Sequence, residues 1–499
     1  MGRIFDNLTA GGSDGFLFDT YPGYSLRAIV GTTTVVAKDV LKPGEWAKVE
    51  LVVDPKTGIA IYKDGVRVAG SEPEATPSRV TQKYILQRFV MACGGRGAFP
   101  IKFNGSIFTV EPTFMGQDFN PDWRRWGDCF WWQNTRFPYH AMLASGDLEM
   151  MDSLFQPFLR TIPLAKARTR IYHGARGAYF PETMTSFGTY SNNDYGWDRT
   201  GHQPKDVLSP WWQYAWNQGP ELVALMLDRY EQSPDPKFLR ETLLPAVASV
   251  LDYFDSRFPK ENGRLKLTPT QAVETYWQDV VNDTPTVAGL HDIVRRLIPI
   301  ASGTWGKARL LAFQKMLPPI PIRNGKIAPA ESYKDQRSNV ENPELYALWP
   351  FRLYGVGRGN TVIAQKTFRE RIERANTGWQ YDGQCAALAG LTDDAKTSLL
   401  AKVANSNPAY RWPVTWGPNY DWLPDQDHGS NLMITLQTML LQEANGKLIV
   451  LPAWPKQWNV KFRLHASRNT VVDVDYRNGK TVVKVTPASR QKDVVVVGR

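Results

Sequence analysis

The chain has 499 residues, too many for one ordinary domain, which indicates two to four domains. Hydrophobic residues make up 42% and charged residues 22%, a balance that is normal for a globular protein and excludes disorder, collagen and coiled coil. No apolar run approaches the roughly 18 residues of a membrane-spanning helix, so we expect no membrane span. The net charge of +10 comes from scattered Lys and Arg without basic clusters, so we expect no nucleic-acid partner.

Residues 1–75 are predicted to form β-strands. The segment WAKVELVVD alternates at Trp46, Lys48 and Glu50, and Asp64-Gly65 predicts a hairpin turn between the strands IAIYK and VRVAG. The stretches FDTYPGYSLRAIVG and LKPGEWAKVELVVD resemble a laminin-G-like (concanavalin-like) jelly roll. Such a domain needs more strands than fit here, so we expect residues 1–75 to be an N-terminally truncated jelly roll that lacks a signal peptide.

Residues 76–445 follow the helical period. In DPKFLRETLLPAVASVLDYFDSRF, one predicted helix face carries an apolar row of Leu239, Leu243, Val247, Val250 and Phe254. Loops rich in Gly, Pro, Asn and Trp separate the predicted helices, and this alternation favours an α/α toroid with its site at one end. Periodicity alone gives only a mostly helical domain.

Residues 446–499 return to the pattern of strands. The segments KLIVLPAWP, NVKFRLHA, TVVDVDY and KTVVKVTP are predicted strands, and Asn478-Gly479 predicts a hairpin turn between the last two. We expect a small C-terminal β-sandwich here.

The unusual feature of the composition is its aromatic content, with 18 Trp, 20 Tyr and 22 Phe. Many of the tryptophans stand beside polar residues, as in WWQNTR, YGWDR and WGPNYDW. Flat aromatic faces beside hydrogen-bonding groups suit sugar rings, although core packing explains any single tryptophan equally well. The 3 Cys and 6 His form neither a disulfide framework nor a zinc motif, so we expect no metal and no cofactor.

Three predicted loops carry candidate catalytic groups. Two carboxylates from separate loops are what glycosidic cleavage requires, one to protonate the leaving oxygen and one to activate water or attack the sugar. Each residue also has an ordinary structural explanation, as a helix cap, a surface ion pair or a loop hydrogen bond. The candidates are Asp128, Asn134 and Arg136 in the first loop, Glu274 in the second, and Asp425, Asp427 and His428 in the third.

An ordered set of segments carries a resemblance to a known family. WWQNTRFPYH, PTQAVETYW, ENPELYALWP, NTGWQYDGQ and DQDHGSNLMITLQTMLLQ occur in the order in which similar segments occur in glycoside hydrolase family 95. This is the inverting α-L-fucosidase and α-L-galactosidase family, and residues from about 84 to 475 resemble an uncharacterised branch of it. The resemblance implies a multidomain fold in which a central all-α (α/α)6 toroid, a six-hairpin glycosidase barrel, is flanked by β-domains.

The same resemblance implies roles for individual residues. Glu274 falls on the family's general acid, Asp427 on its general base, and Asn134 on an asparagine that helps to position the attacking water. Trp132 and the ENPEL segment replace groups that hold the sugar in the family, so fucose specificity does not carry over. We expect a carbohydrate substrate to contact Trp132, Arg136, Glu182, Trp197, Asp198, Glu341, Glu344, Trp379 and His428.

The sequence therefore predicts a glycoside hydrolase that inverts configuration and acts on chain ends of a polysaccharide or glycan side chain. From the resemblance we expect it in the periplasm or outside the cell. Two alternatives stay open. One is an α/α-toroid polysaccharide lyase, with Tyr139-His140 as a conceivable pair, and the other is a glycan-binding protein without catalysis.

Overall fold

The computed structural model describes residues 2–9, 14–31, 33–54, 58–71, 77–104, 126–376, 378–404 and 426–497. The chain forms two compact units. The first contains Met1–Gln82 with Val403–Ser406, and the second contains Lys83–Lys402 with Asn407–Arg499. Among the described residues, no helix is both long and apolar enough to cross a membrane.

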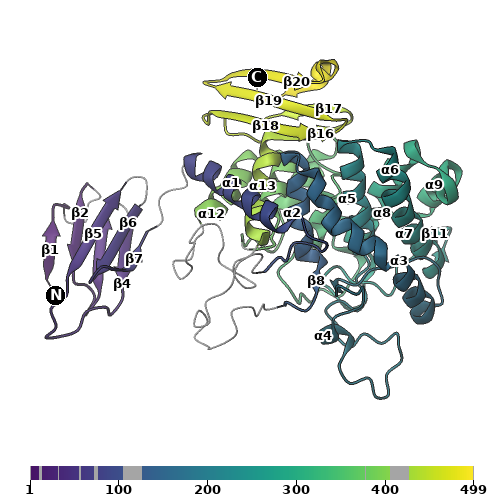
Figure 1. Ribbon diagram of the computed structural model, residues 1–499, viewed down its shortest axis with the longest axis horizontal. Helices are drawn as coiled ribbons and strands as arrows, with labels where there is room; N and C mark the ends of the chain where they lie inside the picture. Colours follow the sequence, from purple (N-terminus) through teal and green to yellow (C-terminus); the bar gives the residue numbers. More distant parts are fainter. Residues whose placement is uncertain are drawn as a thin grey trace. The chain divides into compact units, whose positions relative to one another are not determined.

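The N-terminal unit consists of two antiparallel sheets around one apolar core (Figure 1). Phe18, Leu26, Ile59 and Ile61 form the centre of this core, because alternate residues of facing strands point inward. The first sheet contains β1 (Arg3–Asp6), β2 (Phe16–Asp19), β3 (Leu26–Val30) and β4 (Thr33–Ala37), and the second contains β5 (Val49–Asp54), β6 (Gly58–Lys63) and β7 (Val66–Gly70).

The predicted hairpin turn of this unit is present, while one predicted strand is shorter than expected. Asp64 and Gly65 both have positive φ, 50° and 80°, as a two-residue turn between β6 and β7 requires. The strand predicted from Trp46 begins only at Val49, and Trp46 is fully exposed. The expected alternation of Trp46, Lys48 and Glu50 is therefore absent.

The helical core belongs to the second unit, apart from the start of its first helix and the last two residues of α12. Long loops connect the helices, as the sequence predicts, and Figure 1 shows the helices packed side by side. The helices are α1 (Pro77–Gly94), α2 (Trp132–Ser145), α3 (Asp152–His173), α4 (Asn192–Tyr195), α5 (Gln218–Gln232), α6 (Pro236–Phe238), α7 (Leu244–Arg257), α8 (Thr284–Leu297), α9 (Lys307–Met316), α10 (Thr361–Arg369), α11 (Asp382–Leu388), α12 (Thr392–Ala404) and α13 (Gln426–Leu440).

Short strands join the loops at the edges of this core. They pair within hairpins or across two loops, and none extends beyond three residues. They are β8 (Phe130–Trp131), β9 (Thr183–Met184), β10 (Lys260–Glu261), β11 (Arg264–Leu265), β12 (Val281–Asp283), β13 (Ile322–Arg323), β14 (Lys326–Ile327) and β15 (Ala330–Ser332).

The predicted apolar helix face is nearly complete. Leu243, Val247, Val250 and Phe254 are all buried. Leu239 is only half-buried, because a π-helical turn over Leu239–Leu243 separates α6 from α7. A wider turn rotates the residues before it relative to those after it, so one regular helical period does not describe the whole segment.

The C-terminal residues form two three-stranded sheets that share one core. The turn predicted at Asn478-Gly479 is present, with φ of 49° and 79°. Leu440 of α13 and Ala144 of α2 pack against this core, so the sheets cover the C-terminal ends of these two helices (Figure 1). The strands are β16 (Leu441–Ala444), β17 (Lys447–Val450), β18 (Val460–Ala466), β19 (Thr470–Arg477), β20 (Lys480–Thr486) and β21 (Val494–Val496).

The molecule is thus multidomain, with a helical core and separate β-sheet regions. This agrees with the coarse fold class predicted from the sequence. The six-hairpin order of the toroid, the jelly-roll identity of residues 1–75 and the boundaries 1–75, 76–445 and 446–499 remain predictions.

Candidate active site

Two residues from distant parts of the chain meet near the starts of two packed helices. Asn134 lies near the N-terminus of α2, and Asp427 is the second residue of α13. The Asn134 amide Nδ2 donates a hydrogen bond to Asp427 Oδ2 at 2.5 Å, and both side chains are buried. The N-terminal end of a helix favours a negative charge, so the ionised carboxylate is well accommodated there. The contact brings together the two residues predicted as the general base and the asparagine beside it, and their roles stay predictions.

The start of α13 is held by further hydrogen bonds. The Gln426 backbone N–H donates to the carbonyl of Phe103 at 2.7 Å, and the Gln87 amide of α1 donates to Gln426 Oε1 at 3.0 Å. Further along, Gln437 of α13 donates to the Ala141 carbonyl of α2 at 2.9 Å. These contacts fix the position of Asp427 relative to α2.

Glu274 lies in the loop between β11 and β12, and it is 8% exposed. Its carboxylate oxygen Oε2 accepts a hydrogen bond from the Asn339 amide, and its backbone carbonyl accepts one from Trp277 Nε1 at 2.6 Å. Val273, directly before it, has a φ of 48°. A β-branched residue rarely adopts this left-handed conformation, and such strain concentrates at functional sites.

The side chain of Gln271 holds this loop in place. Its Oε1 accepts a hydrogen bond from the Tyr214 N–H at 2.7 Å, and its amide donates to the Val273 carbonyl at 3.0 Å. Nothing in the sequence pattern marks Gln271, since a glutamine in a loop is usually a surface residue.

A chain of hydrogen bonds connects the Glu274 loop to the start of α2. Thr275 Oγ1 donates to the Glu341 carbonyl at 3.0 Å, and Glu341 Oε2 accepts from the Gln133 amide at 2.7 Å. Gln133 is the neighbour of Asn134. The two predicted catalytic loops and the segment around Glu341 therefore belong to one buried polar network.

Arg136 is the buried cation of this network. Its guanidinium pairs with Glu221, lies 3.7 Å from Glu341 Oε1, and donates to the Tyr346 hydroxyl at 2.9 Å. Burial alone would lower the Arg136 pKa, but Glu221, Tyr346 and Glu341 hold it well above its usual value. Arg136 was expected to contact sugar; the structure instead buries it completely against protein carboxylates.

Glu182 and Glu344 are two buried acids whose pKa values are raised by burial. Burial raises the pKa of Glu182 to about 8, although the Gln133 N–H and the Gln218 amide donate hydrogen bonds to its carboxyl. Burial also raises the pKa of Glu344 to about 7, and its Oε2 has no hydrogen-bond partner among the described residues. Both acids therefore carry a substantial neutral population near neutral pH.

Several residues that were expected to contact sugar lie in the core or on the surface. Trp132 is buried and packs edge-on against Phe158, with ring centroids 5.4 Å apart, so it is a core residue in this structure. Trp197 and Asp198 are exposed on the surface. Trp379 is buried, and His428 is buried with its Nε2 2.9 Å from the Lys402 carbonyl. Burial lowers the pKa of His428 well below its usual value.

Further candidates of the sequence analysis are Asp425 and the pair Tyr139-His140. Asp425 lies outside the described residues. The Tyr139 hydroxyl is within 2.9 Å of Ser153 Oγ and accepts from the Ile101 N–H, while His140 lines a different cavity. The lyase pair suggested by the sequence is therefore not assembled around one site. Within the described ranges, no group of His, Cys, Asp and Glu side chains is arranged to hold a metal ion.

The network also contains residues that sequence reasoning missed. Asn339, Gln133 and Glu221 contact Glu274, Glu341 and Arg136, respectively. The one available signal was the polar run before ENPEL, which contains Asn339 but does not distinguish it from a surface loop.

Comparisons with known proteins show what the fold resembles. No protein-family profile matches the chain, and no curated protein sequence matches it. Among solved structures, a candidate kojibiose phosphorylase from the human microbiome aligns with a TM-score of 0.53 and 12% identity, over 82% of this chain and 61% of that protein. A glycosidase aligns with a TM-score of 0.45 and 13% identity over 73% of this chain and 98% of its own, and a variant of it was solved in complex with glucose.

The first of these similarities shows a shared fold, and this chain spans about three fifths of the phosphorylase. Neither comparison tests the resemblance to glycoside hydrolase family 95, which remains a prediction. The catalytic assignments rest on the geometry around Asp427 and Glu274.

Proposed function

We propose that this protein is a glycoside hydrolase that inverts configuration at the anomeric carbon. Glu274 acts as the general acid, Asp427 as the general base, and Asn134 orients the base. The observation that carries the proposal is the buried hydrogen bond from Asn134 to Asp427 at the start of α13, in the same polar network as Glu274.

The environment of Asp427 suits a base that removes a proton from water. The Asn134 amide donates to one carboxylate oxygen and so stabilises the ionised form, which must be present before the reaction. The N-terminal end of α13 acts in the same direction. The water is deprotonated as its oxygen attacks the anomeric carbon, so the proton ends on Asp427.

The environment of Glu274 suits a proton donor. Its Oε2 accepts a hydrogen bond from Asn339, so a protonated Glu274 holds its own proton on the other oxygen. The strained backbone at Val273 and the contact with Trp277 fix the direction of the carboxyl. As the glycosidic bond breaks, this proton moves to the leaving oxygen.

Phosphorolysis is a second candidate reaction, because one protein with a similar fold is named as a phosphorylase. A phosphorylase replaces the activated water by phosphate, which brings its own negative charge to the anomeric carbon. A buried carboxylate at this place would repel phosphate, so Asp427 favours water as the nucleophile. The proposed substrate is a carbohydrate chain end, and a periplasmic or extracellular location belongs to the same proposal.

The proposal is tested with the full chain, a panel of aryl glycosides and extracted polysaccharides, and the variants Glu274→Gln and Asp427→Asn. Glu274→Gln should lose about 10²–10⁴-fold on natural substrates and less on aryl glycosides, whose leaving groups need little protonation. Asp427→Asn should lose activity on both substrate types. The exposed Glu241→Gln is the control for the same chemical change outside the site.

The first-formed anomer, followed by proton NMR, should be opposite to that of the substrate, with the same rate in the presence and absence of phosphate. Retention of configuration would contradict the inverting mechanism. A phosphate-dependent sugar phosphate would favour phosphorolysis, product absorbance near 235 nm would identify a lyase, and small, equal losses in both variants would make the two residues structural.

A further inference from the structure

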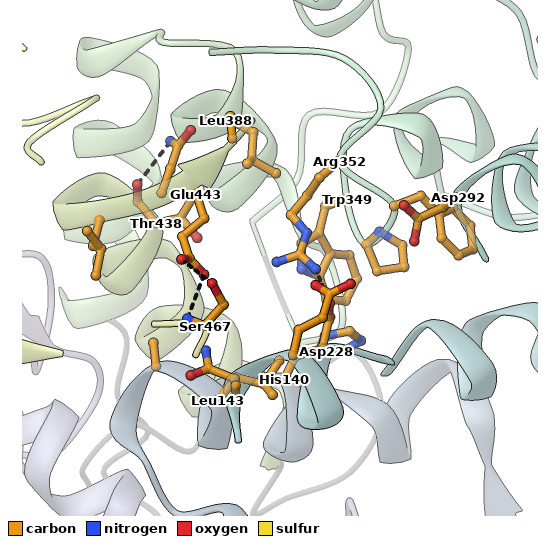
Figure 2. Close-up of a pocket in the computed structure, with 18 of the residues that line it drawn as sticks. His140, Leu143, Asp228, Asp292, Trp349, Arg352, Leu388, Thr438, Glu443 and Ser467 are labelled. Carbon is orange, nitrogen blue, oxygen red and sulfur yellow. Dashed lines mark hydrogen bonds and ion pairs between the residues drawn. The ribbon is translucent and has the colours of Figure 1, made fainter. Parts of the chain in front are cut away.

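A cavity lies along α2 and α13, further toward their C-terminal ends than Asn134 and Asp427. Its volume is about 490 Å³, and it lies between the helical core and the C-terminal sheets (Figure 2). On α2 it is lined by His140 and Leu143, and on α13 by Thr438, whereas Asn134 and Asp427 lie near the starts of these helices. At 1.5 Å per residue, the first lining residues, His140 and Ile434, lie about 9 Å along α2 from Asn134 and about 10 Å along α13 from Asp427.

One side of this cavity is built from a saturated ionic cluster. Arg296 pairs with Asp228 at 2.7 Å and with Asp292 and Glu231 at 2.9 Å each. Its hydrogen-bonding capacity is thereby used within the protein. This cluster explains how several charges can be buried side by side without a ligand.

The other arginines of the cavity are less fully paired. Among the described residues, the Arg352 side chain donates only to Asp228 and the Arg295 side chain only to Asp292, and both carboxylates also pair with Arg296. The side chains of Arg352 and Arg295 remain 36% and 46% exposed. Each guanidinium has five N–H donors, so most of theirs are available to a ligand.

Arg358 has no carboxylate partner among the described residues. It donates one hydrogen bond, at 3.1 Å, to the backbone carbonyl of Glu443. Burial, together with the neighbouring Arg352 and Arg295, lowers its pKa to about 10, so it stays charged at neutral pH. A partly buried cation among other cations is destabilising unless an anion is close to it.

Polar side chains on the opposite side of the cavity are arranged for hydrogen bonding. Glu443 accepts from the Ser467 N–H and hydroxyl at 2.9 and 2.7 Å, and Figure 2 shows this pair across the cavity from Arg352 and Asp228. His140 is 8% exposed, and its Nε2 lacks a partner among the described residues. Burial lowers its pKa to about 3, so the ring is neutral and can exchange one hydrogen bond with a ligand.

The balance of charge favours an anion. The cavity is lined by five arginines, Arg295, Arg296, Arg352, Arg358 and Arg468, and by four acids, Asp228, Glu231, Asp292 and Glu443. The volume lies within the range of sites for small molecules. We propose that this cavity is a second ligand site, which binds a small polar molecule by a carboxylate or phosphate group held by Arg358, Arg352 and Arg295.

The test uses isothermal titration calorimetry of the full chain with three probes: glucuronate, inorganic phosphate and neutral glucose. Glucuronate and glucose share a ring, so their comparison isolates the carboxylate. The variants are Arg358→Gln, Arg358→Lys, and Arg170→Gln as the control, since Arg170 is an exposed arginine on α3. Circular dichroism checks that each variant is folded.

We expect at least one anion to bind through Arg358, whereas any binding of glucose should not depend on Arg358. Arg358→Gln should weaken the anion about tenfold or more, as the loss of a charged hydrogen bond does, Arg358→Lys should weaken it less, and Arg170→Gln should leave it unchanged. Binding of glucuronate without competition from phosphate identifies a carboxylate ligand, and competition identifies a site for either anion.

The proposal is overturned if neither anion binds at about 10 mM, a concentration that reveals millimolar dissociation constants. It is also overturned if folded Arg358→Gln binds the anions like the wild type, or if it weakens the binding of glucose as much as that of glucuronate. Because the test does not use the reaction, its result is independent of the roles proposed for Glu274 and Asp427.

Discussion

The contact between Asn134 and Asp427 allows a quantitative prediction. Asn134→Ala removes the hydrogen bond of 2.5 Å to a fully buried carboxylate. A hydrogen bond to a charged group contributes about 1.5–3 kcal/mol. Since about 1.4 kcal/mol corresponds to one pH unit, the acidic limb of the activity profile should move up by about one to two units.

The direction follows from which form of Asp427 loses its partner. The amide donates to the ionised carboxylate, so its removal disfavours ionisation, and the base is protonated at higher pH than in the wild type. Activity should fall most at acidic pH and recover toward alkaline pH. The assay is the pH dependence of kcat/KM on an aryl glycoside, where proton donation by Glu274 matters least.

Ser153→Ala is the matched control. It removes a buried hydrogen bond between Tyr139 of α2 and α3, and this bond involves no charged group. We expect a small loss of stability and no shift of the acidic limb. An unshifted profile in folded Asn134→Ala would refute the idea that Asn134 tunes the base, and the same shift in both variants would attribute it to general loosening of α2.

Four further results are expected. Burial raises the Glu182 pKa to about 8, so the folded protein keeps a proton that the unfolded chain has already lost at the same pH. The free energy of unfolding should therefore fall as pH rises from about 5 to about 8, by on the order of a few kcal/mol. Chemical denaturation of Glu182→Gln should show a weaker pH dependence of this free energy. Arg136→Met leaves two buried carboxylates without their cation and should lower the free energy of unfolding by about 3–5 kcal/mol, whereas a sugar-binding arginine would change KM without this loss. A crystal structure should show the carboxyl groups of Glu274 and Asp427 about 6.5–9.5 Å apart, and a separation near 5 Å would indicate a retaining enzyme. Turnover of simple α-L-fucosides should be weak or absent, and robust activity would show that the changes at Trp132 and in ENPEL do not affect sugar recognition.

The features that the sequence predicts well are local. The turns at Asp64-Gly65 and Asn478-Gly479 form because these residues readily take positive φ, and the burial of Leu243, Val247, Val250 and Phe254 follows from their spacing on one helix. Such signals depend on neighbours within a few residues, so they can be read from one chain.

The partners of the polar residues were decided by the tertiary structure. Asn134 and Asp427 are 293 residues apart in sequence, and only the packing of α2 against α13 brings them together. The burial of Arg136 against carboxylates and of Trp132 against Phe158 was decided in the same way. A charged or aromatic residue near the start of a helix can face a substrate or the core, and the outcome depends on which distant carboxylate or ring packs beside it.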